Sequence, residues 1–305
     1  MFYSPLRYPG GKNKLSGFIA KLCIDNKING HYVEPYAGGA SVALFLLFEG
    51  FVNKITINDK DKSIYAFWHC VLNNTTELCA LIKNTDISFE NWLIQRGIQK
   101  RKDQVSLIEL GFSTLFLNRT NISGIIMGGV IGGKQQEGSY KMDCRFNKEE
   151  LIKRIKNIAS KKEQITLCSY DAIVLIDKIE EQVENKNIVF YFDPPYYLKA
   201  SSLYMNHYKN DDHQAVSERI KKIKNIKWIV SYDNQKEIRN LYLECVKKEY
   251  SFTHTAYSSR IGNEILFFSN DLQLPCIENW SPLGFKLSIQ KKIAQIIYKH
   301  PVPRV

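Results

Sequence analysis

A short unit within residues 31–59 is the feature that most constrains the fold of this chain. Residues 31–36 (HYVEPY) predict a strand that runs into the turn Ala37-Gly38-Gly39, and an apolar helix-like stretch follows over residues 40–48. Residues 53–59 (NKITIND) alternate as a second strand and end on Asp59. Strand, glycine turn, helix, strand and acid in this order are typical of one half of a doubly wound α/β fold. We therefore predict a Rossmann-like sheet.

Later segments extend this sheet. Residues 188–192 (IVFYF) are a continuous apolar run, as expected of a strand that is buried on both faces. Residues 228–233 (WIVSYD) predict another buried strand. Residues 250–257 and 264–270 predict an antiparallel pair. The chain is therefore expected to form one mixed α/β sheet.

The spacing between the strands leaves room for an insertion. Gly39 and Asp193 are 154 residues apart, whereas three βα units of roughly 30 residues each would use only about 90. Residues 61–150 carry few strand signals and hold helix-like stretches over 64–83 and 105–118. We therefore predict a mainly helical domain inserted into the sheet domain.

A helix-like stretch over residues 149–162 is expected to return the chain to the sheet domain, because its apolar residues lie on one face. The predicted division is an α/β domain in two parts, the inserted domain and a C-terminal extension without an assigned role. These parts comprise residues 1–60 with 151–275, residues 61–150 and residues 276–305.

The charge of the chain indicates a polyanionic partner. Its 42 Lys and Arg against 31 Asp and Glu give a net charge of +11, for which nucleic acid is the simplest ligand.

Val42–Phe48, the longest purely apolar run near the start, is far shorter than the ~20 residues of a membrane span. The first residues hold no apolar signal-peptide region, so a cytoplasmic protein is expected. Seven cysteines without a Cys-x-x-Cys pair, and six histidines without a His-Glu-x-x-His pattern, predict no metal.

The tetrapeptide Asp193-Pro194-Pro195-Tyr196 is the strongest candidate for chemistry. It ends a predicted strand, where open α/β sheets place their ligands, and two prolines make the turn rigid. The Asp193 carboxylate and the Pro194 carbonyl can accept both hydrogens of one amine, while Tyr196 offers a flat face to a ring. This set suits the exocyclic amine of an aromatic base. A plain Pro-Pro turn after a buried strand is the alternative.

A cofactor site is predicted at the first glycine turn, Glu34-Pro35-Tyr36-Ala37-Gly38-Gly39, where the glycines allow a close backbone approach. Asp59 follows Gly39 by 20 residues, close to the usual offset of a carboxylate that binds ribose hydroxyls. Because the complete Gly-x-Gly-x-x-Gly pattern is absent, a nucleoside without phosphates, such as S-adenosylmethionine, fits better than a dinucleotide. A tight turn and a helix cap are the alternatives for these residues.

Residues 7–12 (RYPGGK) place an aromatic and a cation on either side of a glycine turn. Tyr8 is a candidate for stacking on an adenine, and Lys12 is a candidate for contact with a carboxylate. The alternative is an ordered N-terminal arm with a solvated lysine.

In their order along the chain, these segments resemble the motifs of the Dam-like DNA adenine methyltransferases of the alpha group. The similar segments are RYPGGKNKL (7–15), YVEPYAGGASVAL (32–44), IND (57–59), FLNRTNISG (116–124), FYFDPPYY (190–197) and NEILFF (263–268). The resemblance implies a methyltransferase domain that uses S-adenosylmethionine, with the insertion as its target-recognition domain. The implied reaction is methylation of the N6 amine of an adenine flipped out of double-stranded DNA.

The resemblance also implies roles for single residues. Cofactor contacts are implied at Tyr8, Lys12, Asp59, Asp193 and Asp171, although Ala172 stands where the family often has Phe. DNA contacts are implied at Asn118, Arg119 and Asn121, for which a structural turn is the alternative. A monomer or weak dimer, with a restriction endonuclease as functional partner, is the implied setting.

Two other functions stay open on the sequence. One is methylation of another planar amine, such as that of cytosine, an RNA base or glutamine. The other is a catalytically idle DNA-binding module. Asp193 and the insertion favour adenine in DNA, because related tetrapeptides often begin with Ser for cytosine amines and Asn for glutamine.

Overall fold

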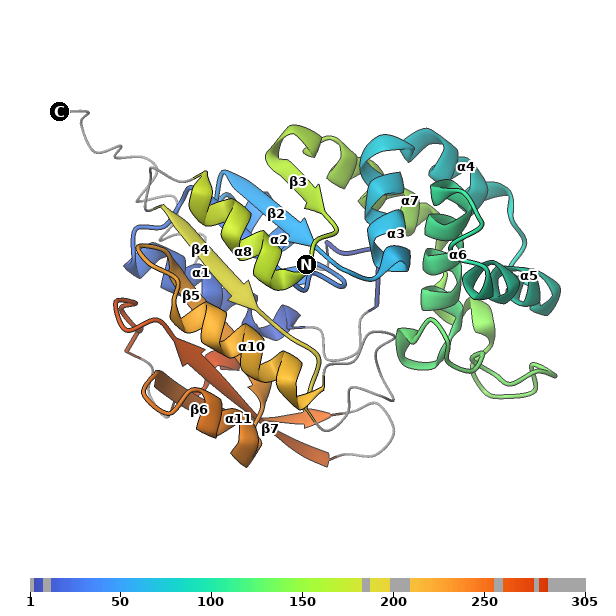
Figure 1. Ribbon diagram of the computed structural model, residues 1–305. Coiled ribbons are helices and arrows are strands. Elements are labelled where there is room, and N and C mark those ends of the chain that lie inside the picture. Colours follow the sequence, from blue (N-terminus) through green and yellow to red (C-terminus); the bar gives the residue numbers. More distant parts are fainter. Residues whose placement is uncertain are drawn as a thin grey trace.

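In the computed structural model, the described residues are 3–7, 12–182, 187–197, 209–254, 260–276 and 280–284. They form one seven-stranded sheet, with helices on both of its faces and a helical body beside it (Figure 1). Across the sheet the strands follow the order β3, β2, β1, β4, β5, β7, β6. In that order they span Ile165–Cys168, Lys54–Asn58, His31–Glu34, Ile188–Phe192, Lys227–Asp233, Arg260–Phe268 and Val246–His254.

The strand directions create a ligand crevice. The five strands from β3 to β5 are parallel, whereas β7 runs antiparallel to β5 and β6 antiparallel to β7. The chain moves from β1 outward to β3 and then crosses to β4 on the other side of β1. At such a reversal the loops after the two central strands diverge and leave a crevice. The segments after Glu34 and Phe192 therefore border the same space.

Helices cover both faces of the sheet (Figure 1). α1 and α2 pack on one face and α8, α10 and α11 on the other. These helices span Ser16–Asp25, Ser41–Phe48, Ala172–Glu181, Asn210–Lys221 and Lys236–Leu241. Tyr32 belongs to the first core and Val33 to the second, because consecutive strand residues point to opposite faces. All five residues of β4 are buried, which explains its uninterrupted apolar run.

The predicted Rossmann-like fold is confirmed. The expected strands over 31–36, 53–59, 188–192 and 228–233 are β1, β2, β4 and β5, and the antiparallel pair is β6 with β7. The edge strand β3 has no recognisable sequence pattern, because it is short and buries only Ile165. Within the described residues, no helix is long and apolar enough to span a bilayer.

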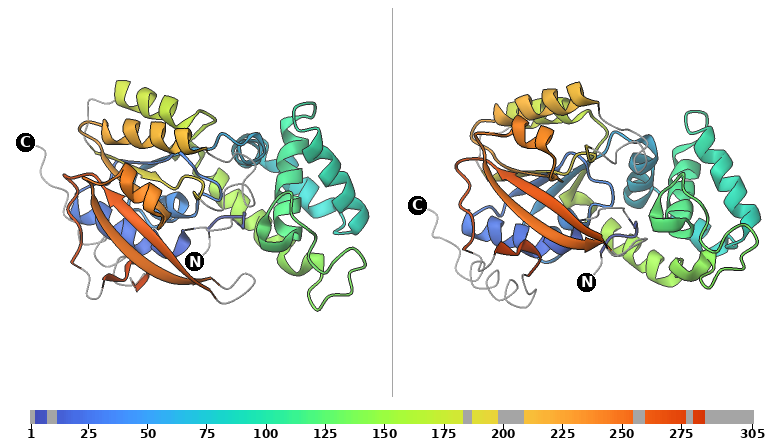
Figure 2. Two further views of the ribbon diagram at one scale, coloured as in Figure 1. Left: turned by 60° about the horizontal axis from the view of Figure 1, so that its bottom comes forward. Right: turned by 90° about the horizontal axis from the view of Figure 1, so that it is seen from below.

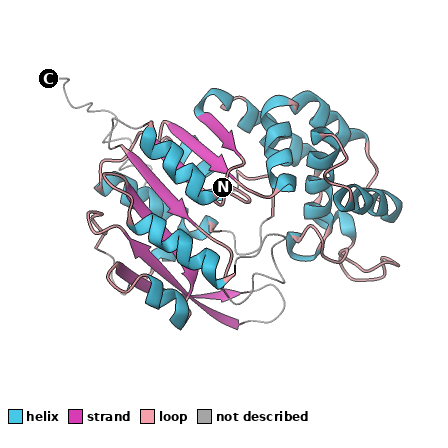
Figure 3. Cartoon of the chain, viewed as in Figure 1, coloured by secondary structure: helices cyan, strands magenta, loops and turns pink. Residues whose placement is uncertain are grey.

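Between β2 and β3 the chain forms a body of helices and loops (Figure 3). Its helices α3, α4, α5, α6 and α7 span Lys62–Asn73, Thr75–Asn84, Phe89–Lys100, Leu107–Thr120 and Lys148–Ala159. α6 packs against α3, α4 and α5, and α7 packs against α3 and α4. The sequence analysis placed residues 149–162 with the sheet domain, whereas α7 packs within the helical body. The two views of Figure 2 show this body to one side of the sheet domain.

Side-chain caps explain where these helices begin. Asp61, Ser88 and Asn147 each accept a hydrogen bond from a backbone amide in the first turn of α3, α5 and α7. Ser106 and Glu109 form a reciprocal capping box at α6. Capping residues in the sequence therefore define the starts of four helices of the insertion.

Candidate active site

A pocket of about 480 Å³ lies between the carboxyl edge of the sheet and the helical insertion. Its sheet side consists of residues that follow β1, β2 and β4. Its other side consists of the N-terminal arm (residues 3–7) and residues of the insertion. The predicted site residues in its lining are Lys12, Glu34, Pro35, Tyr36, Gly39, Asp59, Arg119, Asp193 and Pro195. The fold therefore gathers into one space residues that are far apart in the sequence.

Glu34, at the end of β1, holds a buried carboxyl group. It accepts hydrogen bonds from the Tyr32 hydroxyl (2.9 Å) and the Ala43 amide (3.1 Å). Burial raises the pKa of Glu34 to about 8, although these two hydrogen bonds act in the opposite direction. The group therefore binds a proton near neutral pH until a cationic or hydrogen-bond-donating ligand favours its ionised form.

The turn after β1 has an unusual backbone. Gly38 and Ala40 have φ angles of 46° and 47°, in the left-handed region, which costs a residue with a side chain roughly 1 kcal/mol. Trp68 of α3 donates its indole N–H to the Gly38 carbonyl (2.9 Å), and the Gly38 amide donates to Asp59 (2.9 Å). The insertion and the second strand thus hold the turn from both sides.

Asp59, which follows β2, lines the pocket beside this turn. Its carboxylate accepts hydrogen bonds from the backbone amides of Gly38 and Asp61, both at 2.9 Å. Burial, and next the neighbouring Asp61 carboxylate, raise the pKa of Asp59 to about 7. The side chain is therefore fixed in position, while its ionised form is only partly populated near neutral pH.

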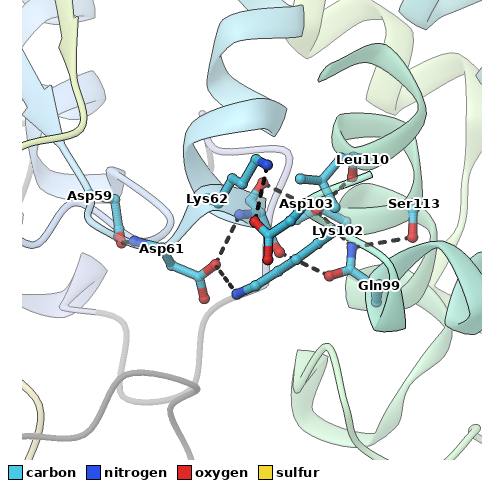
Figure 4. A network of polar contacts seen from close by, with 10 residues as sticks. Asp59, Asp61, Lys62, Gln99, Lys102, Asp103, Leu110 and Ser113 are labelled. Carbon is cyan, nitrogen blue, oxygen red and sulfur yellow. Dashed lines mark hydrogen bonds and ion pairs between the residues drawn. The ribbon is translucent and has the colours of Figure 1, made fainter. Parts of the chain in front are cut away.

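A continuous polar network joins Asp59 to the insertion (Figure 4). Asp61 accepts a hydrogen bond from the Ser63 amide (2.9 Å), and the Ser63 hydroxyl donates to Gln99 (2.8 Å). The Gln99 amide then donates to the Ser113 hydroxyl (3.2 Å). Because the network runs from β2 through α3 to α5 and α6, it sets the position of the insertion relative to the pocket.

Tyr170 and Tyr36 are two of the four tyrosines in the pocket lining, with Tyr3 and Tyr191. Asn58 fixes the backbone of Tyr170 by accepting from its amide (2.7 Å) and donating to its carbonyl (3.0 Å). Asp171 is not part of the pocket lining. Its carboxylate caps α8 and pairs with Lys60 at 3.0 Å. The aromatic residue next to Asp171 is therefore Tyr170, which precedes it. The resemblance predicts an aromatic residue at the following position, where this chain has Ala172.

Asp193 ends β4 and lies in the pocket with 24% of its side chain exposed. Its Oδ1 accepts a hydrogen bond from the Ser231 hydroxyl (2.6 Å) and lies 3.4 Å from Lys12 Nζ. The Tyr191 hydroxyl donates to Ser231 in turn (3.1 Å). Burial raises the pKa of Asp193, while Lys12 and Ser231 oppose this shift. These neighbours orient the carboxylate at the edge of the pocket.

A buried charge network centred on Lys12 lies behind this carboxylate. Lys12 Nζ donates to Glu264 (2.7 Å) and to the Tyr196 hydroxyl (2.8 Å), and it lies 4.8 Å from the centre of the Tyr196 ring. The hydroxyls of Tyr196 and Tyr250 both donate to Glu264. Burial lowers the pKa of Lys12, but Asp193, Tyr196 and Glu264 outweigh it and hold this pKa well above its usual value. Lys12 therefore stays charged and holds Tyr196 in one orientation.

This network changes one expectation about the N-terminal segment. Lys12 is 7% exposed, so it is neither a solvated lysine nor free of protein partners. Its partners are side chains of the sheet domain, which lie close to the predicted catalytic carboxylate. Tyr8, the predicted partner of an adenine, lies outside the described residues.

Two residues with an expected DNA contact have a structural role. Asn118 and Asn121 are almost completely buried. Asn118 binds the backbone of Arg7 in both directions, accepting at 2.7 Å and donating at 2.6 Å. Asn121 accepts from Trp92 (2.6 Å) and donates to two backbone carbonyls. Because both amides already use their donors and acceptors inside the protein, the expectation of direct DNA contact is corrected for them. Arg119, between them, lines the pocket.

The sequence analysis missed several residues that surround the predicted carboxylate. Ser231 lies inside the buried strand β5, and Glu264 begins the apolar run of β7. A polar residue inside an apolar strand needs a hydrogen-bond partner, and this is the signal that could have identified both. Tyr170 carries no comparable signal.

Fold and pocket together define a Rossmann-like methyltransferase. Residues 8–256 match the D12 class N6 adenine-specific DNA methyltransferases, and the chain belongs to this family. The chain is also similar to the Type II methyltransferase M.MjaIII of Methanocaldococcus jannaschii. The two are 23% identical over 227 residues, which cover 68% of this chain and 75% of that protein. The prediction of an adenine-specific DNA methyltransferase is thereby confirmed at the level of the family.

Proposed function

We propose that the protein transfers a methyl group from S-adenosylmethionine to the N6 amine of an adenine flipped out of double-stranded DNA. The observation that carries this proposal is the presence of Glu34, Asp59 and Asp193 in one pocket, at the ends of three neighbouring parallel strands. The first two carboxyl groups suit a nucleoside donor and the third suits an amine acceptor. Donor and acceptor would then meet in one site, as direct transfer requires.

The donor set of the pocket fits S-adenosylmethionine. Asp59 can accept hydrogen bonds from ribose hydroxyls and Glu34 can bind the cationic amino group, while Tyr36 and Tyr170 offer rings to the adenine. Burial raises the pKa of both carboxyl groups, so a ligand that brings hydroxyl or ammonium donors compensates for the lost water. The bound cofactor supplies a methyl group on a sulfonium. Pro35, Gly38 and Gly39 form the backbone against which it would lie.

Residues of the tetrapeptide hold the target amine in this proposal. The Asp193 carboxylate and the Pro194 carbonyl each accept one amine hydrogen, so the nitrogen lone pair points toward the methyl group. Asp193 also stabilises the positive charge that develops on the nitrogen. Pro195 fixes the turn, and Tyr196 is preset for stacking because Lys12 and Glu264 hold its hydroxyl.

The substrate duplex would lie between the sheet domain and the insertion, and extrusion of the adenine would cost a few kcal/mol. We assign catalysis to the sheet domain, residues 1–60 with 151–275 apart from α7, and target recognition to residues 61–150 together with α7, which packs in the helical body; residues 276–305 receive no role. A net charge of +11 supports a polyanionic substrate. As functional partner we propose a cognate restriction endonuclease, as the resemblance of the motifs implies. We further propose that the protein acts in the cytoplasm as a monomer or weak dimer.

Cofactor binding and base flipping can be tested separately. Calorimetry should detect binding of S-adenosylmethionine to the protein, and Asp59→Asn should weaken it. A duplex with 2-aminopurine at the methylated position should gain fluorescence when the protein binds, because the base leaves the stack. No heat of cofactor binding would contradict the proposed donor, and DNA binding without a fluorescence gain would contradict the flipping step.

A further inference from the structure

Four arginines gather on the wall of the pocket that faces the sheet. They are Arg7 of the N-terminal arm, Arg119 of α6, Arg145 of η3 (Met142–Arg145) and Arg154 of α7. They come from four separate segments of the chain, and all four line the same cavity as the Asp193 carboxylate. The fold therefore concentrates positive charge beside the predicted target amine.

These arginines lack the carboxylates that normally accompany a cluster of cations. Within the described residues, only Arg154 has an ion-pair partner, Glu150 at 2.9 Å. Arg7 Nη1 and Arg119 Nε are buried and have no hydrogen-bond partner in the part of the chain that the structure describes. Burial, and next the charges of Arg7, Arg154 and Arg145, lower the pKa of Arg119 to about 10. Such an arrangement destabilises the unliganded protein, and an anion would satisfy it.

The local structure specifically places Arg7 in this cluster. Asn118 holds the Arg7 backbone by two hydrogen bonds. Gly124, at the end of η2 (Ile122–Gly124), has a φ of 77°, and a Cβ there would lie only 2.4 Å from the Arg7 carbonyl oxygen. The insertion thus uses a buried amide and a glycine to bring this cation close to the others.

We propose that Arg7, Arg119, Arg145 and Arg154 bind backbone phosphates of the DNA strand that delivers the adenine. This inference rests on the proposed function. Guanidinium groups match phosphate oxygens in charge and geometry, and contacts of this kind fix the register of a protein on DNA. The cofactor is the less suitable anion, because its single carboxylate accompanies a sulfonium and an ammonium. The sheet side of the pocket holds the carboxyl groups of Glu34 and Asp59 and suits that ligand better.

The test is the salt dependence of DNA binding by Arg119→Gln and Arg145→Gln. Fluorescence anisotropy with a duplex of about 20 base pairs gives log Kd against log salt concentration. Each lost phosphate contact should reduce the slope by about 0.9 and weaken binding about tenfold at low salt. Arg239→Gln is the matched control. It removes the same charge from α11, outside the pocket, where Arg239 pairs with Glu249 at 3.1 Å. The control should keep the slope of the wild type.

Two further readouts separate this inference from the proposed function. The affinity of both variants for S-adenosylmethionine should stay unchanged; a loss would identify a cofactor carboxylate site and overturn the inference. Without DNA, Arg119→Gln should raise Tm by a few °C, because it removes a buried, repelled cation; a lower Tm with an unchanged slope would make Arg119 a structural residue instead. If the DNA affinity of the wild type does not depend on salt concentration, the proposed function is overturned as well. If the wild-type slope is steep and the variants keep the same slope, only the assignment of the arginines is overturned.

Discussion

In the proposed function, Asp193 has to bind an amine and also stay ionised. Burial alone would favour the neutral acid, which carries no negative charge to stabilise a cation. Ser231 and Lys12 counter this effect by donating to one of its oxygens and by supplying a positive charge. Glu264 in turn keeps Lys12 in place. Single residues behind the pocket thus decide the charge of the one that acts in it.

Replacing Asp193 should therefore remove chemistry without unfolding the protein. Asp193→Asn keeps the size of the side chain but loses the negative charge opposite the developing cation. We expect methyl transfer to slow by about 10²–10³-fold, the usual effect of losing one preorganised group. Single-turnover kinetics with labelled cofactor measure this rate, and Asp271→Asn, a surface carboxylate paired with Lys227, is the control. Near-normal turnover by Asp193→Asn would contradict its assigned role.

The buried carboxyl groups of Asp59 and Glu34 predict a pH dependence of cofactor binding. Their pKa values of about 7 and about 8 lie above the ordinary values of about 4. Between these pH values the folded protein therefore binds more protons than the unfolded protein does. The free energy of unfolding contributed by these groups is therefore highest at low pH and falls as the pH rises through them. A cofactor that needs the ionised forms should instead bind more tightly as the pH rises.

Affinity for S-adenosylmethionine should accordingly rise about tenfold or more between about pH 6 and pH 8 and then level off. Calorimetry across this range measures the effect. Asp59→Asn should bind the cofactor more weakly and with a shallower pH dependence, since only Glu34 then titrates. An affinity that falls with rising pH would contradict the assigned roles of both carboxyl groups.

Among the elements, the close contact of α3 and α6 sets the shape of the insertion. Gly111 of α6 faces α3 so closely that a Cβ would lie 2.6 Å from Cys70 Sγ and 2.7 Å from the Ala66 carbonyl oxygen. Gly111→Ala should therefore cost about 1–3 kcal/mol of unfolding free energy. Gly97 of α5 is the matched control, because nothing lies within 4 Å of its added Cβ. Gly97→Ala should instead stabilise by about 0.5–1 kcal/mol, and urea unfolding that gives both variants the same sign would contradict this description.

The junction between the arm and the insertion depends on Asn118. Its amide makes two hydrogen bonds to Arg7 and one to the Gly124 carbonyl (2.8 Å). Asn118→Ala leaves these buried backbone groups without partners, so we expect a loss of about 1–3 kcal/mol in urea unfolding. DNA affinity should fall with it, because Arg7 loses its support. An unchanged stability would show that the arm is held in another way.

Sequence patterns predicted those elements whose burial is uniform. β4 and β5 are buried on both faces, and their apolar runs stand out from the surrounding sequence. α5 has only a few buried positions and the edge strand β3 only one, so neither produced a clear pattern. The capping residues at the start of α5 were present, but a cap without a strong apolar stripe does not identify a helix.

Backbone topology alone accounts for the predicted site residues that line one pocket. Glu34, Asp59 and Asp193 each end a central parallel strand, and parallel strands end at one edge. Asn118 and Glu264 could not be assigned in this way, because their partners, Arg7 and Lys12, are more than a hundred residues away in the sequence. A buried amide and a surface amide have the same letter in the sequence, and only the fold shows which of them is used internally.

At the scale of the whole molecule, the pocket divides charge between two bodies. Carboxyl groups lie on the sheet side, together with Lys12 and Lys60, and arginines lie on the side of the arm and insertion. The hydrogen-bond network from Asp59 to Ser113 sets the distance between these sides (Figure 4). A cationic cofactor and an anionic DNA strand can therefore approach the same point from opposite walls. In the proposed function, this separation brings the methyl donor and the target amine together next to Asp193.

The most direct test is methyl transfer from labelled S-adenosylmethionine to unmethylated genomic DNA, followed by nucleoside analysis and modified-base sequencing. We predict that the label appears in N6-methyladenine at one short sequence, and that Asp193→Asn abolishes most of it. Label in N4-methylcytosine, or no transfer to DNA by the intact protein, would contradict the function described for this pocket.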